Sequence, residues 1–319
     1  MEYIHVDEIP ELNDPLFVLA FEGWNDAAQS ATIAARYLVS RFDGKRFARF
    51  QSEDFFQFSD QRPHVRLGTD GKRVITWPEN SFYYCKHPEL ARDLVVCVGV
   101  EPQLMWKSFS RSVMELIRRC GSGLTVTMGG LLAENPHDEP LELVCIATEP
   151  RLAGLTGVQV TKYEGPTGIV GVIHTELQDA RIPAVSLWVN IPQKISSLPN
   201  PKGAYALLKR LEAVSKINID LDELGRSADQ FDEKVKEVIE HQPSNERFLS
   251  QPFTTQDDGD DMDTDPLEDE SAEEESPEKL PSGDELASEW GPRPGRPISA
   301  PGPWKVHVLQ ATDTSIRLG

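Results

Sequence analysis

The segment 16–27, LFVLAFEGWNDA, has the clearest pattern of apolar and polar positions in the chain. Residues 16–21 are all apolar, which is typical of a strand covered on both faces in a parallel sheet. Gly23 then frees the backbone to turn, and Asn25 or Asp26 can accept from the first N–H groups of a following helix. The pattern predicts a strand, a turn and a helix start, with any site near the carboxyl end of the strand.

Similar apolar runs alternate with helical periodicity through the first 200 residues. In the segment 62–77, two short strand-like runs flank an Asp-Gly pair, which predicts a hairpin outside the main sheet. Met105 is expected to point inward from a helix, and Pro166 suits a first helical turn. The fold class is therefore α/β, a three-layer α/β/α sandwich. Helices are expected at 26–42, 103–119 and 163–177, and strands at 16–21, 47–51, 93–100, 124–128, 143–147, 157–162 and 182–189.

From residue 202 onward the pattern is helical only, with apolar residues every three or four positions. Two helices joined near 218–220 are expected to form a helical hairpin whose apolar stripe packs on or beside the core, or alternatively binds a partner or a second copy. The expected domains are a core at 1–200, this helical extension at 201–250, an acidic disordered linker at 251–280, and a short helix start with an irregular tail at 281–319.

The formal charge of −20 is concentrated in one segment. Between residues 256 and 278 there are 13 acidic residues and no basic one, which leaves −7 for the remainder. The negative charge of the rest of the chain argues against nucleic acid or an anionic membrane as a partner. The N-terminus has no signal-peptide pattern and no apolar run approaches the roughly 20 residues of a membrane span, so a cytoplasmic protein is expected.

The four cysteines have no zinc-like spacing and are expected to be buried free thiols, so neither a metal site nor a cofactor is expected. Common phosphate-binding, dinucleotide, nucleophile-elbow and zinc-protease motifs are absent, and no catalytic residue is assigned. Several polar residues and glycines nevertheless follow predicted strands at one sheet edge, where they either bind a ligand or serve as turns and helix caps. These candidates are Glu22, Gly23, Asn25, Asp26, Gly129, Gly130, Glu164, Gly165, Thr167 and Asn190.

Four motifs together resemble the PAC2 family, which is named for a proteasome assembly chaperone. They are EGWNDA, the Met-Gly-Gly at 128–130, YEGPTGIVG and PAVSLWVNIP, and the resemblance covers residues 16–241. It is strongest to the actinobacterial branch, whose members have a helical C-terminal extension. It implies a core similar to purine nucleoside phosphorylases and related hydrolases, and it implies homo-oligomers, of which a trimer is one state.

Family members that act on proteasomes dock through a C-terminal hydrophobic residue, a tyrosine and one final residue. This sequence ends with IRLG, so docking through such a tail is not expected. No nucleophile or phosphate-binding set of the phosphorylases can be matched residue by residue either.

Two classes of function follow. The favoured one is a non-catalytic binding or assembly protein with a protein partner, because every standard catalytic motif is absent. The alternative is an enzyme for a nucleoside-like or small anionic substrate, with a cleft lined by Glu22, Asn25, Asp26, Glu164 and Thr167.

Overall fold

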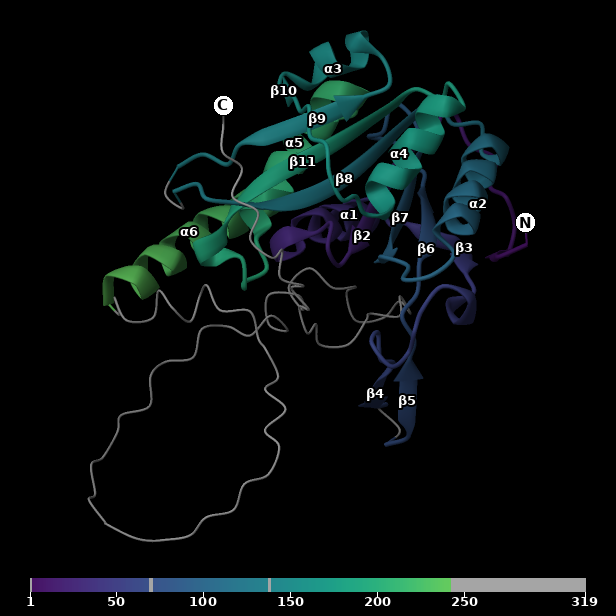
Figure 1. The fold of residues 1–319 in the computed structure, drawn as a ribbon, viewed down its shortest axis with the longest axis horizontal. Helices are drawn as coiled ribbons and strands as arrows, with labels where there is room; N and C mark the ends of the chain where they lie inside the picture. Colours follow the sequence, from purple (N-terminus) through teal and green to yellow (C-terminus); the bar gives the residue numbers. More distant parts are fainter. Residues whose placement is uncertain (1, 69–70, 137–138, 242–319) are drawn as a thin grey trace, which may run out of the picture.

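The computed structural model describes residues 2–68, 71–136 and 139–241, so the predicted acidic linker and irregular tail lie outside the described residues. One sheet of nine strands forms the centre of the described part, in the order β1-β3-β6-β7-β2-β8-β11-β9-β10 (Figure 1). Its middle consists of four parallel strands: β7 (Leu94–Val100), β2 (Leu16–Glu22), β8 (Leu124–Ala133) and β11 (Ala184–Pro192).

Antiparallel strands extend this parallel centre on both sides. On one side lie β6 (Ser81–Cys85), β3 (Lys45–Phe50) and β1 (Ile4–Val6), each antiparallel to its neighbour. On the other side β9 (Leu143–Ala147) runs antiparallel to β11 and pairs in parallel with the short β10 (Gln159–Val160).

Helices cover both faces of the sheet, which confirms the three-layer α/β/α fold. The side chains of β2 alternate between the two hydrophobic layers, as those of a doubly covered strand must. One layer is formed with α1 (Ser30–Arg41), α3 (Pro150–Thr156), α5 (Pro201–Ser215) and the start of α6 (Asp222–His241). The other is formed with α2 (Trp106–Arg119) and α4 (Ile169–Asp179).

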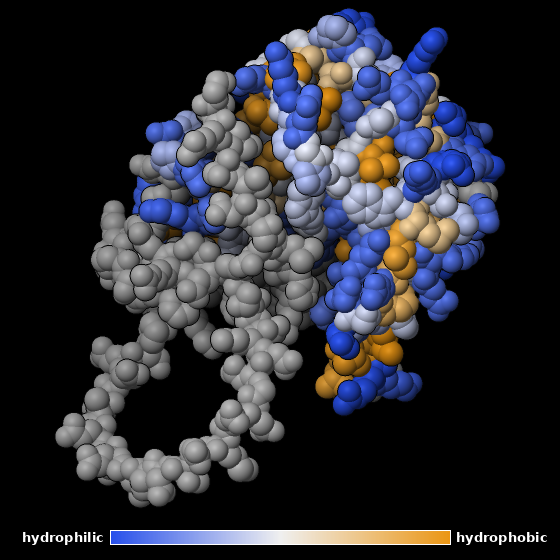
Figure 2. Space-filling model, in the orientation of Figure 1, coloured by the Kyte–Doolittle hydropathy of each residue, from blue (hydrophilic) through white to orange (hydrophobic). Residues whose placement is uncertain are grey.

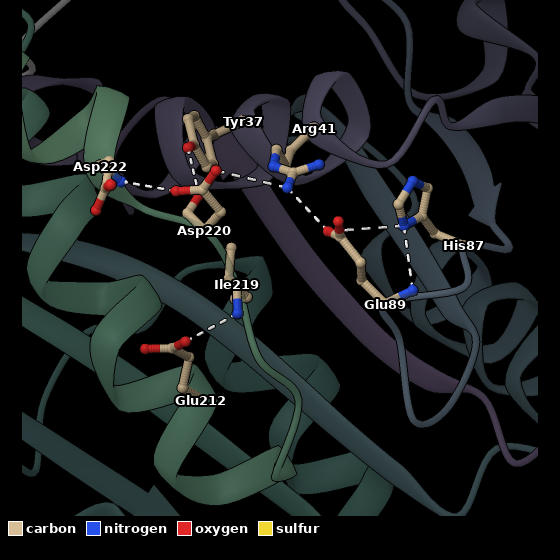
Figure 3. Close-up of polar contacts among 8 residues, drawn as sticks. All are labelled: Tyr37, Arg41, His87, Glu89, Glu212, Ile219, Asp220 and Asp222. Carbon is tan, nitrogen blue, oxygen red and sulfur yellow. Dashed lines mark hydrogen bonds and ion pairs between the residues drawn. The ribbon is translucent and has the colours of Figure 1, made fainter.

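The connection between α5 and α6 is attached to α1 by polar contacts (Figure 3). The Tyr37 hydroxyl donates to the Asp220 carbonyl at 2.6 Å, and Arg41 lies 3.5 Å from the Asp220 carboxylate. Arg41 also pairs with Glu89 at 2.8 Å, which joins the same point to the loop before β7. Because α5 itself packs along α1, the C-terminal helices belong to the same packed layer as α1.

The predicted hairpin is confirmed as a separate two-stranded sheet. β4 (His64–Leu67) pairs antiparallel with β5 (Arg73–Thr76), and the pair projects away from the body (Figure 1). Short 3-10 segments lie at Ala27–Gln29, Ser52–Asp54 and Gln193–Ile195. Within the described residues, no helix is both long and apolar enough to span a membrane.

Several predicted boundaries were wrong. Strand β8 continues through the two glycines that were expected to follow it, and β11 continues through Asn190 to Pro192. Met105 is exposed and precedes α2, and Pro166 precedes α4, whose N-cap is Gly168. These errors share a cause, because strand pairing and helix ends depend on neighbouring elements that local periodicity does not reveal. Strand β6 and helix α3 were not predicted.

Candidate functional site

Asp26 caps the first turn of α1. Its carboxylate accepts from the backbone N–H of Ala31 at 2.6 Å and of Thr32 at 3.2 Å, and from the Thr32 hydroxyl. Gln29, the residue before the helix, has φ 55° and gives no side-chain cap, so Asp26 supplies the acceptor from outside. Burial raises the pKa of Asp26 to about 6, although these hydrogen bonds oppose the rise. Asp26 therefore serves as a helix cap, which is one of the two roles that the sequence left open for it.

Glu101 joins the two predicted strand-to-helix corners. It follows β7 directly, and its Oε1 accepts from the Asn25 amide at 2.5 Å and from the Ile169 backbone N–H at 2.8 Å. Ile169 is the first residue of α4, so one carboxylate holds the end of β2 against the start of α4. Burial raises the pKa of Glu101, while these two hydrogen bonds and one from the Trp24 backbone act in the opposite direction.

Gly129 and Gly130 contact protein groups closely. A Cβ on Gly130 would lie 2.9 Å from the backbone N and O of Ala27, and one on Gly129 would overlap the Trp188 ring. The Gly130 N–H also donates to the Asn25 carbonyl at 2.8 Å. The glycines are thus explained by the close approach of the segment after β2 and of the Trp188 ring on β11.

The second corner differs in exposure along its length. Gly168 is buried, and a Cβ there would overlap the Asn25 amide and the Glu101 carboxylate. Glu164, Gly165 and Thr167, by contrast, are exposed. The structure therefore brings Asn25 and Gly168 together at Glu101 and leaves the other three candidates of this corner in solvent.

Glu22 lies in a different environment from Glu164, although the alternative enzyme function places both carboxyl groups in one cleft. It is the last residue of β2 and largely buried, and its carboxylate lies 4.0 Å from the Arg36 guanidinium. Burial raises the pKa of Glu22 to about 8, against the attraction of Arg36. Glu164 is exposed, so the two carboxyl groups are not in a shared buried pocket.

The raised pKa of Glu22 gives a testable dependence of stability on pH. Between its ordinary pKa of 4.5 and about 8, the folded state binds more protons than the unfolded state, so the free energy of unfolding falls as pH rises. We expect the advantage of Glu22→Gln over the wild type to grow by about 2 kcal/mol between pH 5 and pH 9. This is about half of the upper limit set by about 1.36 kcal/mol per pH unit, because the Glu22 side chain is 15% exposed and solvent screens its charge. Urea unfolding measures it, and a constant difference across that range would contradict the assignment.

The bridge through Glu101 gives a second prediction. Glu101→Ala leaves the buried Asn25 amide and the Ile169 N–H without this acceptor, so we expect the free energy of unfolding to fall by about 2 kcal/mol. A double-mutant cycle with Asn25→Ala should give a coupling of about 1 kcal/mol. The exposed Glu164→Ala is the matched control and should change stability by less than about 0.5 kcal/mol. If the effects of Glu101→Ala and Asn25→Ala on the free energy of unfolding were additive, the hydrogen bond between the two residues would not stabilise the fold.

The remaining candidates and the missed residue complete the site. Gly23 is exposed, with φ 124°, a conformation that favours glycine. Asn190 is half-buried within β11, and its N–H donates to the Glu142 carbonyl at 2.8 Å. Glu101 was missed, although its position directly after a predicted buried strand is the signal that identified Glu22.

All four cysteines are buried and free, as predicted. Within the described ranges, no cluster of three or more histidine, cysteine or acidic side chains could hold a metal ion.

Comparisons with known proteins extend over most of the described chain. The profile of the PAC2 family matches residues 20–239. A PAC2 family protein from Streptomyces avermitilis is 38% identical, with 75% of this chain and 100% of that chain covered and a TM-score of 0.67. A structure from Mycobacterium tuberculosis described as a proteasome-assembly chaperone homologue is 33% identical, with 74% and 100% covered and a TM-score of 0.67.

A more distant structure shares the fold alone. An archaeal proteasome activator from Pyrococcus furiosus is 21% identical, with 75% of this chain and 99% of that chain covered and a TM-score of 0.60. No curated protein matches the chain. Because the family profile covers more than half of the sequence and two solved structures exceed 30% identity over their full length, the chain belongs to the PAC2 family.

Proposed function

We propose that the protein is a non-catalytic binding or assembly protein, chaperone-like in action, that works as a homo-oligomer on a protein partner. The observation that carries the proposal is that the buried residues gathered at this sheet edge serve the fold. Asp26 caps α1, Glu101 links Asn25 to α4, and Gly130 accommodates the backbone of Ala27. An active site would need such groups to be open to a substrate.

The partner we propose is a protein complex of the proteasome kind. The M. tuberculosis structure, described as a proteasome-assembly chaperone homologue, is 33% identical and is covered along its whole length. The P. furiosus proteasome activator shares the fold. The cytoplasmic location predicted from the sequence stays a prediction.

One observation favours the enzyme alternative. Within the described residues, the Asn25 Oδ1 and Glu22 Oε2 atoms are buried without a hydrogen-bond partner. Buried polar atoms usually have a partner, so a small polar ligand that reaches either atom would satisfy it. The enzyme would then act on a nucleoside-like or small anionic substrate.

A ligand screen separates the two functions. The full chain is heated with nucleosides, nucleotides, phosphate and small carboxylates, and the unfolding temperature is recorded. A ligand at about 100 times its Kd should stabilise by about 2.7 kcal/mol, which is roughly 5–10 °C for a chain of this size. We expect no shift. A shift that is lost in Thr167→Ala and Glu164→Gln, with turnover of the ligand, would favour the enzyme.

An assembly assay tests the partner directly. Purified, unassembled proteasome α and β subunits are mixed with and without the protein, and the yield of assembled particles is followed on native gels. We expect a higher rate or yield at equimolar protein. An unchanged rate together with no binding of either subunit would contradict the proposed partner, and the ligand screen would still decide between binding protein and enzyme.

A further inference from the structure

The hairpin β4–β5 with its flanking residues, 62–77, is called the arm here, and it has an exposed apolar face. Val65 and Ile75 lie directly opposite each other, and Leu67 lies on the same face, because residues two apart share a face of a strand. They are 56%, 56% and 71% exposed, and Figure 2 shows orange apolar groups on this projection. An isolated two-stranded hairpin is only marginally stable in water, so a segment that covers this face would stabilise the arm.

The arm is basic, whereas the rest of the folded chain is acidic. The segment 62–77 has four basic residues and one acidic residue, which gives a net charge of +3. Because the chain outside 256–278 has a charge of −7, it has −10 once the arm is also left out. Arg66 and Arg73 are exposed, and within the described residues neither makes an ion pair. Arg73 lies directly opposite Leu67, so positive charge borders the apolar face.

The segment 256–278 of the same chain has the complementary composition. It contains 13 acidic residues and no basic one, and Met262 and Leu267 lie among the acidic residues. Opposite charges and matched apolar groups are the features that pair two protein surfaces. The arm offers both to this segment.

Helix α2 has the same net charge as the arm but a different surface. It also has four basic residues and one acidic residue. Its aliphatic side chains and Phe109 are buried against the sheet, and Arg119 is already paired with Glu115 at 2.7 Å. Along its length α2 therefore offers charge without an apolar face, which favours the arm as the docking surface.

The acidic segment is long enough to reach the arm. It begins 15 residues after His241, the last residue of α6. That many extended residues span about 50 Å, whereas a folded domain of this size has a radius of gyration of about 18 Å. A segment joined to the same chain meets the arm at an effective concentration on the order of millimolar. An acidic segment of a second copy or of another protein needs a similar concentration to compete, which favours the segment of the same chain.

We propose that the acidic segment 256–278 packs on the arm of its own chain. Its carboxylates pair with the arginines of the arm, and its apolar residues cover the face formed by Val65, Leu67 and Ile75. A protein that binds the arm must then displace this segment first. The inference is independent of the proposed function, whose two tests do not involve the arm.

A cross-link in the full chain tests the contact. The native cysteines are buried, so introduced surface cysteines react selectively. Chains with Val74→Cys and Thr264→Cys, which leave the apolar face intact, are treated at low concentration with a short bismaleimide. The matched control pairs Thr264→Cys with Glu115→Cys, at a side chain that is 45% exposed on α2, and leaves the basic residues of α2 in place.

Denaturing gels and peptide mass spectrometry identify the cross-linked product. We expect a product of single-chain mass that forms about tenfold faster with Val74→Cys than with Glu115→Cys, a difference that a few exposed ion pairs can supply. A product of two-chain mass would assign the segment to a second copy. Equal rates at the two sites would leave the arm open to another protein. Either result would overturn the inference.

Charge reversal identifies the residues that hold the segment. Arg66→Glu with Arg73→Glu, added to the arm cysteine pair, should slow its cross-linking about tenfold, to the rate at α2. The control Arg111→Glu with Arg118→Glu reverses two exposed arginines of α2 and should keep the fast rate. A slower rate in this control would place the segment on α2 and contradict the proposal.

Salt covers the case in which the arm variant misfolds. At 1 M NaCl the Debye length is about 3 Å, so the chain with unchanged arginines should lose its fast rate as the reversed chain does. A fast rate that withstands 1 M NaCl would show that charge does not hold the segment on the arm, and the proposal would be wrong.

Discussion

Replacing Asp26 with alanine is expected to lower the free energy of unfolding by about 4 kcal/mol, because it leaves several buried groups without their acceptor. Asp26 is 5% exposed, and its carboxylate accepts from the N–H groups of Ala31 and Thr32 and from the Thr32 hydroxyl. Each buried donor that loses its partner costs about 1–3 kcal/mol. Urea unfolding near neutral pH measures the loss.

Two variants control this result. Asp26→Asn keeps one acceptor oxygen and should lose less, about 1–2 kcal/mol. Asp229→Ala removes an exposed aspartate from α6 and should stay within about 0.5 kcal/mol of the wild type. If Asp26→Ala were as stable as the wild type, the capping role would be wrong, and a ligand role for Asp26 would gain support.

Acid is expected to weaken the fold through His174. This residue is buried in α4, both ring nitrogens lack a hydrogen-bond partner in the described structure, and burial lowers the pKa of the imidazole to about 4. Between its ordinary pKa of 6.5 and about 4 the unfolded state binds the proton and the folded state does not, so the free energy of unfolding falls as pH falls. At about 1.36 kcal/mol per pH unit, the loss approaches 3 kcal/mol.

The variant His174→Leu tests this dependence. It should lose less stability than the wild type between about pH 6.5 and 4, by up to about 3 kcal/mol, because leucine has no proton to bind. His64→Gln, at an exposed histidine of β4, is the matched control for removal of a histidine. Parallel profiles for His174→Leu and the wild type would show that His174 does not control acid stability.

Elements with a strong internal pattern were predicted well. The unbroken apolar run of β2 alternates its side chains between two buried layers, and α5 and the start of α6 lie close to the predicted positions. The hairpin was predicted from its Asp-Gly turn signal, which is a local property. Such features depend on residues that are neighbours in the sequence, so the sequence contains them.

The candidate site was predicted only in part. The sequence placed Asn25, Asp26 and the Gly129–Gly130 pair at the correct sheet edge. It did not show that Gly130 pairs within β8 and approaches Ala27, nor that Gly168 packs on the Asn25 amide. Those contacts join segments more than a hundred residues apart, and no local pattern reports them.

By itself, the sequence determined the α/β/α architecture, the family and the edge of the sheet at which polar residues gather, because apolar periodicity and short motifs specify these locally. Only the tertiary structure decided what the polar residues do. Glu101 became the link between Asn25 and α4 because β7 lies beside β2 in the sheet. The β4–β5 hairpin became an exposed projection because no other described strand pairs with it. Both outcomes depend on which elements lie next to one another, and that order arises from packing of the whole chain.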